Sequence, residues 1–208
     1  MLEAFKLDGL AALVTGAATG IGRAAALALA EAGADVAVLG HFHDPEETRQ
    51  AIEALGRRAL SFRGDLSGPA FRNRIVEEVL RQWGRIDILV NNAGTIARAP
   101  AVDFPEADWD RIIELNLTTL FRMCQGVGRT MLAQKHGKII NLASLLSFSG
   151  GITVPAYAAS KGGVAQITKA LANEWARFNV NVNAIAPGYI LTELTRALHG
   201  DPVRSRQI

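Results

Sequence analysis

Short apolar runs alternate with longer amphipathic segments along most of the chain. The runs contain mainly leucine and β-branched residues with little polar alternation, which is the pattern of strands buried on both faces of a sheet. Six runs of this kind predict strands over residues 11–14, 36–39, 59–62, 88–91, 138–142 and 181–186.

The segments between these runs repeat apolar residues at helical spacing. They predict helices over residues 21–32, 45–55, 70–83, 106–134 and 156–178. Strands that alternate with helices are usually joined by right-handed crossovers, so we expect an α/β fold with a doubly wound parallel sheet of the Rossmann type. No linker, low-complexity tract or internal repeat divides the sequence, and residues 1–208 are therefore expected to form one domain.

Composition narrows the possible functions. The chain has 208 residues and a net charge of +2, and its scattered basic residues form no stripe of the kind that binds nucleic acid. Three glycines and an arginine interrupt the most apolar stretch, residues 10–32, and charged residues precede it, which argues against a membrane span or a signal peptide. Cys124 is the only cysteine, which is typical of the reducing cytoplasm. We therefore expect a cytoplasmic protein without a nucleic acid or membrane partner.

A glycine-rich loop connects the first predicted strand to the first helix. Its sequence is Thr15-Gly16-Ala17-Ala18-Thr19-Gly20-Ile21-Gly22. Glycine lets the backbone approach a ligand closely, and the free N–H groups at the start of the helix attract phosphate. The spacing G-x-x-x-G-x-G differs from the G-x-G-x-x-G of other dinucleotide folds, and no Gly-Lys-Ser/Thr of a P-loop follows. An ordinary tight turn is the alternative, but the position at the first strand–helix junction favours a dinucleotide site.

A second polar turn, Asn91-Asn92-Ala93-Gly94, ends the fourth predicted strand. Ligands of open α/β sheets lie beyond the carboxyl ends of the strands, so this turn is expected to face the same cleft. Asparagine and glycine are also ordinary turn residues, which leaves a purely structural role open.

The strongest group of candidate catalytic residues is Ser144, Tyr157 and Lys161. Tyr157 and Lys161 are four residues apart at the start of a predicted helix and therefore share a face. An ammonium stabilises a nearby phenolate, so we expect Lys161 to lower the pKa of Tyr157, while Ser144 can hydrogen-bond a substrate oxygen as charge develops on it. Asn116 has a poor helix propensity in mid-helix, which indicates a polar role. A surface Tyr–Lys pair and a solvated Asn116 are the alternatives.

Together these residues resemble the short-chain dehydrogenase/reductase family along nearly the whole chain. The matching positions, in the family's order and spacing, are Thr15-Gly16, Gly20-Ile21-Gly22, Asp65, Asn91-Asn92-Ala93-Gly94, Asn116, Ser144, Tyr157, Lys161, Pro187-Gly188 and Thr192. The resemblance implies that Tyr157 is the catalytic acid/base and that Ser144 positions the substrate carbonyl. It further implies that Lys161 tunes Tyr157 and holds the nicotinamide ribose, and that Asn116 anchors a water in the proton path.

The resemblance also implies a nicotinamide cofactor and no metal. Asp65 would meet the adenine and Thr192 the nicotinamide carboxamide. Gly40 stands where NAD-preferring members often carry Asp, and Thr19 stands where NADP-preferring members often carry Arg or Lys. We expect NAD as the cofactor, with NADP possible. The expected cofactor-binding residues are Thr15, Gly16, Thr19, Gly20, Ile21, Gly22, His41, Asp65, Leu66, Asn92, Ala93, Gly94, Tyr157, Lys161, Pro187, Gly188, Ile190 and Thr192.

Within the family, five segments look like the group of 2-dehydro-3-deoxy-D-gluconate 5-dehydrogenases, which are also described as 2-deoxy-D-gluconate 3-dehydrogenases. These segments are residues 1–5, 145–148, 150–152, 154–155 and 186–189. The resemblance implies hydride transfer to or from a small sugar acid. It also implies a homotetramer, and a further strand and helix past the point where this sequence stops.

We expect Arg98, Ser144 and Tyr157 to form the substrate site. A guanidinium holds a carboxylate through two parallel hydrogen bonds, so Arg98 is the candidate for binding the acid group, and a solvated loop arginine is the alternative. Two other functions stay open at this point: reduction of a 3-oxoacyl thioester, and dinucleotide binding with little catalysis.

Overall fold

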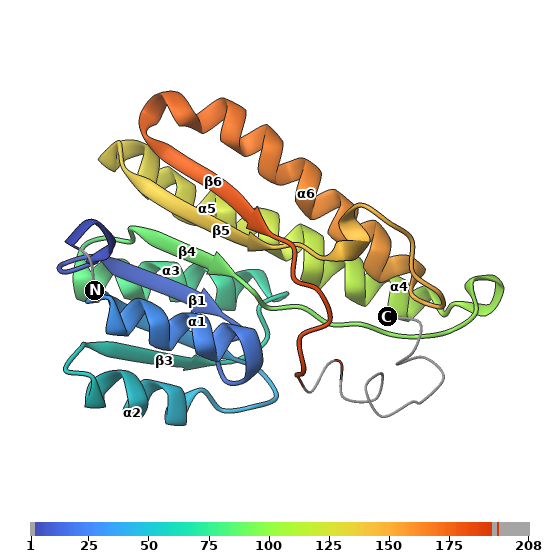
Figure 1. The fold of residues 1–208 in the computed structure, drawn as a ribbon, viewed down its shortest axis with the longest axis horizontal. Coiled ribbons are helices and arrows are strands. Elements are labelled where there is room, and N and C mark those ends of the chain that lie inside the picture. The colour runs from blue at the N-terminus through green and yellow to red at the C-terminus, as the bar shows by residue number, and fades with distance from the viewer. Residues whose placement is uncertain (1–2, 193–194, 196–208) are drawn as a thin grey trace.

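A parallel sheet of six strands forms the centre of the structure and confirms the predicted α/β fold (Figure 1). The computed structural model describes residues 3–192 and 195. The strand order is β3-β2-β1-β4-β5-β6, and every neighbouring pair is parallel. Because the order reverses between β1 and β4, the loops that follow these two strands diverge and leave a crevice at the carboxyl end of the sheet. The strands are β1 (Ala11–Thr15), β2 (Asp35–Gly40), β3 (Ala59–Arg63), β4 (Ile88–Asn91), β5 (Gly137–Leu142) and β6 (Val180–Ile185).

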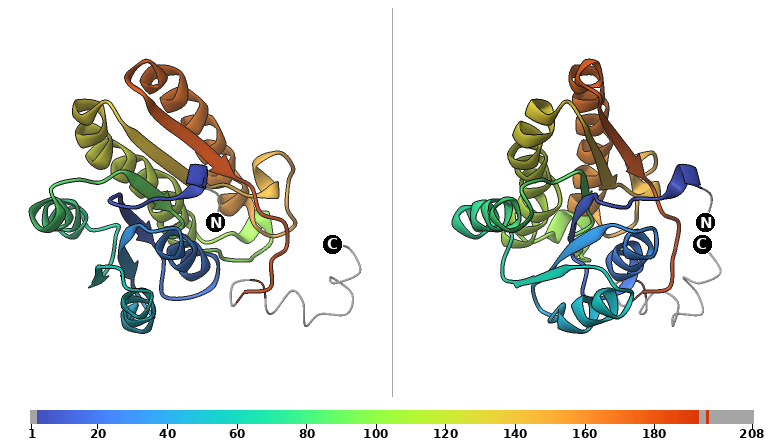
Figure 2. Two further views of the ribbon diagram at one scale, coloured as in Figure 1. Left: turned by 60° about the vertical axis from the view of Figure 1, so that its left-hand side comes forward. Right: turned by 90° about the vertical axis from the view of Figure 1, so that its left-hand side faces the viewer.

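Helices cover the sheet in two layers (Figures 1 and 2). On one face, α1 (Gly20–Glu31) and α2 (Glu46–Ala54) pack against Ala12 and Val14 of β1. On the other face, α3 (Pro69–Trp83), α5 (Leu120–Gln134) and α6 (Pro155–Trp175) pack against a cluster that includes Leu13. Successive strand residues point to opposite faces, and every residue of β1 and β2 is buried, so both strands are continuous apolar runs rather than alternating ones.

The predicted helix over residues 106–134 is interrupted in the structure. It consists of α4 (Glu106–Ile113), a π-helical turn (Glu114–Thr119) and then α5. The turn contains Asn116, whose side chain bonds to the main chain of Thr95 on the neighbouring loop. Helical periodicity within one segment does not reveal a contact with another segment. For this reason the sequence pattern predicts one uninterrupted helix.

Within the described part of the chain, none of the helices combines the length and the apolar character that crossing a membrane requires.

Candidate active site

The glycine loop is held in a shape that only glycine adopts readily. Gly16 and Gly20 have φ angles of 63° and 56°, in the left-handed region. A Cβ atom at Gly22 would overlap the carbonyl oxygen of Gly16, so the first turn of α1 sits directly against the loop. The N-cap residue, Thr19, makes no side-chain hydrogen bond to this turn within the described part of the chain. The first N–H groups of α1 therefore remain available to an anion.

Two neighbouring hollows lie at the carboxyl end of the sheet. The larger, about 370 Å³, is lined by residues of the loops after β1, β2, β3 and β4. The smaller, about 120 Å³, contains Ser144, Tyr157 and Lys161 on its wall. Ile21, Asn92, Gly94 and Thr192 line both, which makes the two hollows one continuous cleft. The expected residues on its wall are Gly16, Thr19, Gly20, Ile21, His41, Asp65, Leu66, Asn92, Ala93, Gly94, Ser144, Tyr157, Lys161, Pro187, Gly188, Ile190 and Thr192.

Thr15 is placed behind the cleft rather than on its wall, and Gly22 likewise packs behind the loop. The Thr15 hydroxyl is buried, donates to the carbonyl oxygen of Val90 and accepts the N–H groups of Asn92 and Ala93. The Asn92 amide in turn donates to the carbonyl oxygens of Thr15 and Gly16. Thr15 thus joins the loops after β1 and β4 and supports the cleft from behind. The spacing of the motif does not distinguish this position from one in direct contact with a cofactor.

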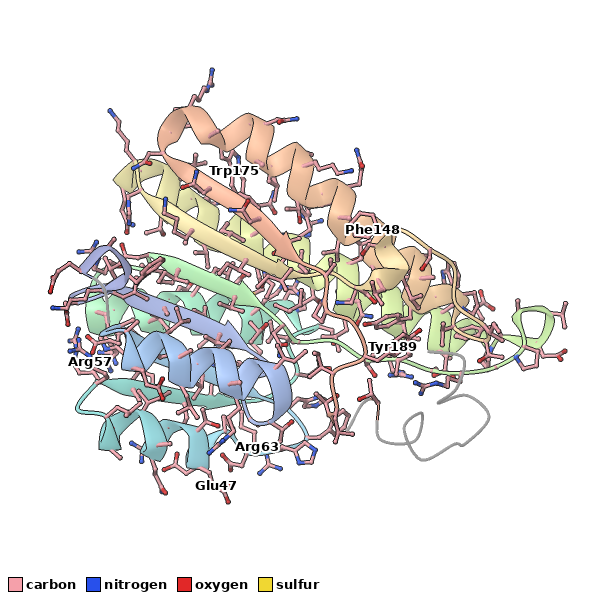
Figure 3. All side chains as sticks on the ribbon, in the orientation of Figure 1. Glu47, Arg57, Arg63, Phe148, Trp175 and Tyr189 are labelled. Atoms are coloured by element: carbon pink, nitrogen blue, oxygen red, sulfur yellow. The ribbon has the colours of Figure 1, made fainter. Side chains whose placement is uncertain are left out.

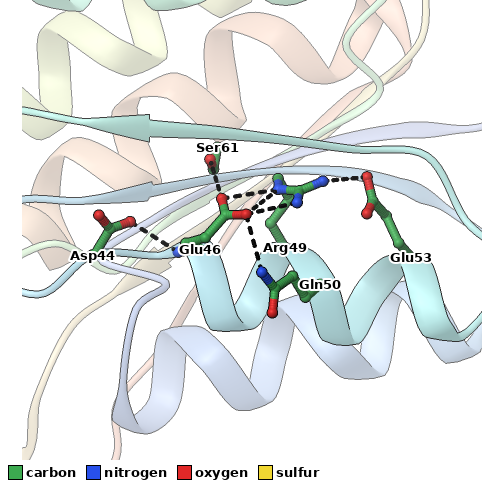
Figure 4. A network of polar contacts seen from close by, with 6 residues as sticks. All are labelled: Asp44, Glu46, Arg49, Gln50, Glu53 and Ser61. Carbon is green, nitrogen blue, oxygen red and sulfur yellow. Dashed lines mark hydrogen bonds and ion pairs between the residues drawn. The ribbon is translucent and has the colours of Figure 1, made fainter.

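A polar network around Glu46, at the start of α2, holds the end of the loop that follows β2 (Figure 4). Its carboxylate accepts hydrogen bonds from Arg49, Gln50 and Ser61, and Asp44 accepts the Glu46 N–H at 3.0 Å. The hydrogen bond from Arg49 is the largest cause that lowers the pKa of Glu46, to about 2. This network anchors the start of α2 and with it the preceding loop.

That loop presents two histidines to the larger hollow. His41 and His43 line it, and the His41 ring lies 4.2 Å from the Phe42 ring, centroid to centroid. Arg63, at the end of β3, donates to the carbonyl oxygens of His41 and Phe42. A Cβ atom at Gly40 would overlap the carbonyl oxygen of His43. The end of β2 therefore has no room for an acidic side chain in place of Gly40.

Lys161 is buried beneath Tyr157. Only 5% of Lys161 is exposed, and its Nζ lies 5.7 Å from the centroid of the Tyr157 ring. Nζ donates to the carbonyl oxygen of Leu142 at 2.5 Å, at the end of β5. Burial disfavours the charged ammonium and lowers the pKa of Lys161 to about 8.

The pKa of Tyr157 is raised, which corrects the expectation that Lys161 would lower it. Burial is the largest cause, because it disfavours the phenolate. A hydrogen bond from Ser144 and the charge of Arg98 act in the opposite direction. The ammonium of Lys161 instead donates a hydrogen bond to the carbonyl oxygen of Leu142.

Ser144 stands at the start of a short 3₁₀ turn, Leu145–Ser147, that follows β5. Its Oγ accepts the N–H of Leu146, and its own N–H donates to the Oγ of Ser147. The Ser147 hydroxyl then donates to the carbonyl oxygen of Lys161 at 2.7 Å. Ser147 thus contacts two of the three candidate catalytic residues.

Asn116 is completely buried and its amide is already bonded. Its Oδ1 accepts the N–H of Thr95 at 2.8 Å, and its Nδ2 donates to the carbonyl oxygen of Thr95 and to the Oγ of Ser160. These contacts join the π-helical turn, the loop after β4 and α6. The solvated alternative for Asn116 is therefore wrong.

Arg98 lies on the exposed loop after β4, outside both linings. Its charge nevertheless acts to lower the pKa of the Tyr157 phenol. Apolar residues border the region as well: Phe148 and Tyr189, on the segments after β5 and β6, are 75% and 43% exposed (Figure 3).

Two residues that the sequence analysis did not single out help to build the site. One is Ser147, which completes a capping box with Ser144 although the sequence signature of that motif has Glu or Gln in this place. The other is Arg72, which is 8% exposed and donates to the carbonyl oxygens of Leu66 and Ser67 and to the Thr119 hydroxyl. Arg72 thereby connects the loop after β3 to the π-helical turn. A buried arginine on a helix gives no signal in the sequence that separates it from a solvated one.

Comparison with known proteins supports the reading of these motifs. Two curated relatives are named 2-dehydro-3-deoxy-D-gluconate 5-dehydrogenase. The protein from Bacillus subtilis (strain 168) is 52% identical, and the match covers 99% of this chain and 81% of the relative. The protein from Dickeya dadantii (strain 3937) is 48% identical, with 100% and 82% covered.

A solved structure shares the fold closely. The gluconate 5-dehydrogenase from Burkholderia cenocepacia J2315, in complex with NADP and tartrate, is 40% identical with a TM-score of 0.90, and the match covers 98% of this chain and 80% of that chain. The resemblance to the deoxy-gluconate dehydrogenase group is thus confirmed. The model of the short chain dehydrogenase family matches residues 10–202. The chain therefore belongs to the short chain dehydrogenase family.

Proposed function

We propose that this protein is an NAD(P)-dependent dehydrogenase that interconverts a hydroxyl and a carbonyl group on a small sugar acid. The observation that carries the proposal is the continuity of the two hollows: the Ser144, Tyr157 and Lys161 wall opens directly onto the glycine-loop hollow. Membership of the dehydrogenase family and the names of the most similar relatives support the same reaction class. We further propose that residues 1–208 act as one dinucleotide-binding domain.

The cleft fits a dinucleotide. The N–H groups of the first turn of α1 would bind its phosphates. Gly16 and Gly20 place no side chain of their own between these N–H groups and the hollow. Asp65 and Leu66 would lie on the adenine side, and Thr192, with Lys161, on the nicotinamide side. When bound, the nicotinamide would supply the acceptor or donor of the hydride.

The proton moves at the Tyr157 hydroxyl. In reduction of a carbonyl, the Tyr157 phenol gives its proton to the substrate oxygen, and in oxidation of an alcohol the phenolate takes it back. Ser144 lies on the same wall of the cleft as Tyr157 and would share the same substrate oxygen. Lys161 would hold the ribose from its place on the wall. Because the amide of Asn116 is already used, Asn116 would act through the turn that it holds rather than by touching the substrate.

The acid group of the substrate would be bound by Arg98. The guanidinium lies close enough to the phenol for its charge to act on Tyr157, on the exposed side of the cleft. A substrate whose hydroxyl meets Tyr157 would therefore have its carboxylate within reach of Arg98. The names of the relatives, which refer to gluconate and deoxy-gluconate compounds, support a substrate of this size and charge.

We propose that both cofactors bind, with a modest preference for NAD that rests on the resemblance to the deoxy-gluconate dehydrogenase group; the cleft itself also suits NADP. The crowding at Gly40 leaves no acidic group at the end of β2 to repel a 2′-phosphate, and His41 and His43 line that part of the cleft. The solved gluconate 5-dehydrogenase contains NADP, which supports acceptance of the phosphorylated form. Titration of the protein with each cofactor is expected to give dissociation constants within about tenfold of one another, which is about 1.4 kcal/mol.

We also propose a cytoplasmic homotetramer. The buried thiol of Cys124 and the absence of any second cysteine in the sequence suit a reducing compartment. Trp109 on α4 and Val102 just before it are 41% and 92% exposed and would be covered in an assembly with two-fold symmetry. Light scattering at micromolar concentration is expected to give four times the mass of the chain, and a monomer mass would contradict the tetramer.

The reaction is tested with a panel of sugar acids, simple polyols and 3-oxoacyl thioesters, each assayed with NAD and with NADP. The proposal predicts the highest kcat/KM on a sugar acid. A preference for thioesters would identify the thioester reductase instead. Tight cofactor binding without turnover on any compound would identify a dinucleotide-binding protein with little catalysis.

A further inference from the structure

The hydroxyl of Ser147 connects two catalytic elements that belong to different parts of the fold. Its Oγ accepts the main-chain N–H of Ser144 at 3.2 Å and donates to the main-chain carbonyl oxygen of Lys161 at 2.7 Å. Ser144 follows β5, whereas Lys161 and Tyr157 belong to α6. One side chain therefore sets the position of the serine relative to the helix that carries the tyrosine.

A simple cap of the 3₁₀ turn does not account for both contacts. The reciprocal bonds between Ser144 and Ser147 complete a capping box for the turn Leu145–Ser147. The bond to Lys161 crosses from this turn to α6 and adds nothing to the cap. A carbonyl oxygen has two lone pairs, so the Lys161 carbonyl can accept this bond in addition to the one within its helix.

The contact has a chemical consequence at Tyr157. A hydrogen bond from Ser144 lowers the pKa of Tyr157 against the effect of burial. That effect depends on the position of the Ser144 side chain, and the Ser144 backbone is extended and is held at its N–H by Ser147. Loss of the Ser147 hydroxyl would leave the Ser144 N–H without its acceptor and would weaken the action of Ser144 on the phenol.

We propose that Ser147 is a positioning residue for the catalytic group of Ser144, Tyr157 and Lys161. The proposal rests on the proposed dehydrogenase function, because it concerns the same tyrosine. Ser147 is on the lining of neither hollow, and it acts by fixing Ser144 against α6.

The test compares Ser147→Ala with Ser147→Thr and with Ser149→Ala. Thr keeps the hydroxyl. Ser149 is exposed, and within the described part of the chain its hydroxyl bonds locally, to the carbonyl oxygen of Leu145 at 3.3 Å, so Ser149→Ala is a matched control in the same loop.

In steady-state oxidation of the best substrate of the panel, Ser147→Ala is expected to lower kcat by roughly tenfold to a hundredfold. Its cofactor dissociation constant should stay unchanged, and the acid limb of its pH–rate profile should move to higher pH by about one unit. Ser147→Thr should restore most of the rate and the profile, and Ser149→Ala should behave as the unchanged protein. A Ser147→Ala protein with native kcat and profile overturns the proposal. So does a loss of rate that leaves the pH profile in place and that Thr does not rescue, since that pattern belongs to a merely structural residue.

A second measurement does not depend on turnover and separates this proposal from the proposed function. The sequence contains two tyrosines, Tyr157 and Tyr189, so in a Tyr189→Phe background the ultraviolet absorbance of tyrosinate reports Tyr157 alone. Adding Ser147→Ala to that background should move the titration of Tyr157 to higher pH, and adding Ser149→Ala should not. An unmoved titration contradicts the role of Ser147 even if the enzyme is active. A moved titration supports it even if every compound of the panel fails as a substrate.

Discussion

The ammonium of Lys161 donates to the carbonyl oxygen of Leu142 and not to the hydroxyl of its neighbour Tyr157. This bond ties α6 to the carboxyl end of β5 and places the lysine below the ring, 5.7 Å from its centroid. Desolvation then acts on both groups, making the ammonium of Lys161 easier to deprotonate and the phenol of Tyr157 harder to ionise.

The lowered pKa of Lys161 predicts a characteristic pH dependence of stability. Below about pH 8 the lysine is charged in both the folded and the unfolded chain, and its burial is unfavourable. Between about 8 and the ordinary value of 10.5 the unfolded chain binds more protons than the folded one, so the free energy of unfolding rises with pH. Lys161→Met removes this titration. Urea unfolding at about pH 7.5 and about pH 10 should show that the stability of the Met variant, relative to the unchanged protein, falls as pH rises. A relative stability that is constant or rises with pH would contradict the assigned direction.

Arg98→Ala tests whether the charge near Tyr157 recognises the substrate. Loss of a charge-assisted contact should raise the transition-state barrier by roughly 1.5–3 kcal/mol for a sugar acid and much less for its uncharged analogue. Because the charge of Arg98 lowers the pKa of Tyr157, the acid limb of the oxidation profile should also move to higher pH with both compounds. Arg81→Ala is a suitable control, since Arg81 lies on α3 and is paired with Glu78. Equal losses on the acid and on the neutral analogue would show that Arg98 supports the loop and does not bind the carboxylate.

Much of the fold could be predicted from the sequence because the strands are buried on both faces. β1 and β2 appear in the sequence as continuous apolar runs, and the structure extends the predicted strands by no more than one residue at either end. The π-helical turn at Asn116 could not be predicted in this way. A π turn changes the helical spacing by less than one residue, and here it coincides with hydrogen bonds to Thr95 that arise only when the loop after β4 is in place.

The catalytic residue types could be predicted from their spacing, but their electrostatics could not. Tyr157 and Lys161 share a helix face as expected, yet burial and the direction of the Lys161 side chain reverse the expected shift at Tyr157. The roles of Ser147 and Arg72 depend on which carbonyl oxygens the fold brings within reach. No pattern along the chain specifies those partners.

Two glycines of α5 provide a matched test of the packing between helices. A Cβ atom at Gly126 would meet only Val76, at an ordinary contact distance of 3.9 Å, whereas one at Gly128 would lie 2.7 Å from the Trp175 ring. Gly126→Ala should therefore stabilise the protein by about 0.5–1 kcal/mol through helix propensity. Gly128→Ala should destabilise it by roughly 1–3 kcal/mol, because α5 and α6 must move apart. Chemical unfolding decides the matter, and effects of the same sign would show that Trp175 does not pack against α5 as described.

In the proposed reaction, the Tyr157 hydroxyl transfers the proton within the dinucleotide cleft. Tyr157→Phe keeps the ring that packs above Lys161 and removes only the hydroxyl, so it separates catalysis from binding. The direct measurement is the turnover of this variant on the best substrate of the panel, together with titration of the variant with NAD and NADP. We predict that turnover falls by roughly 10²–10⁴ while both dissociation constants stay close to those of the unchanged protein. A variant that keeps near-native turnover would contradict the assignment of Tyr157 as the catalytic acid/base.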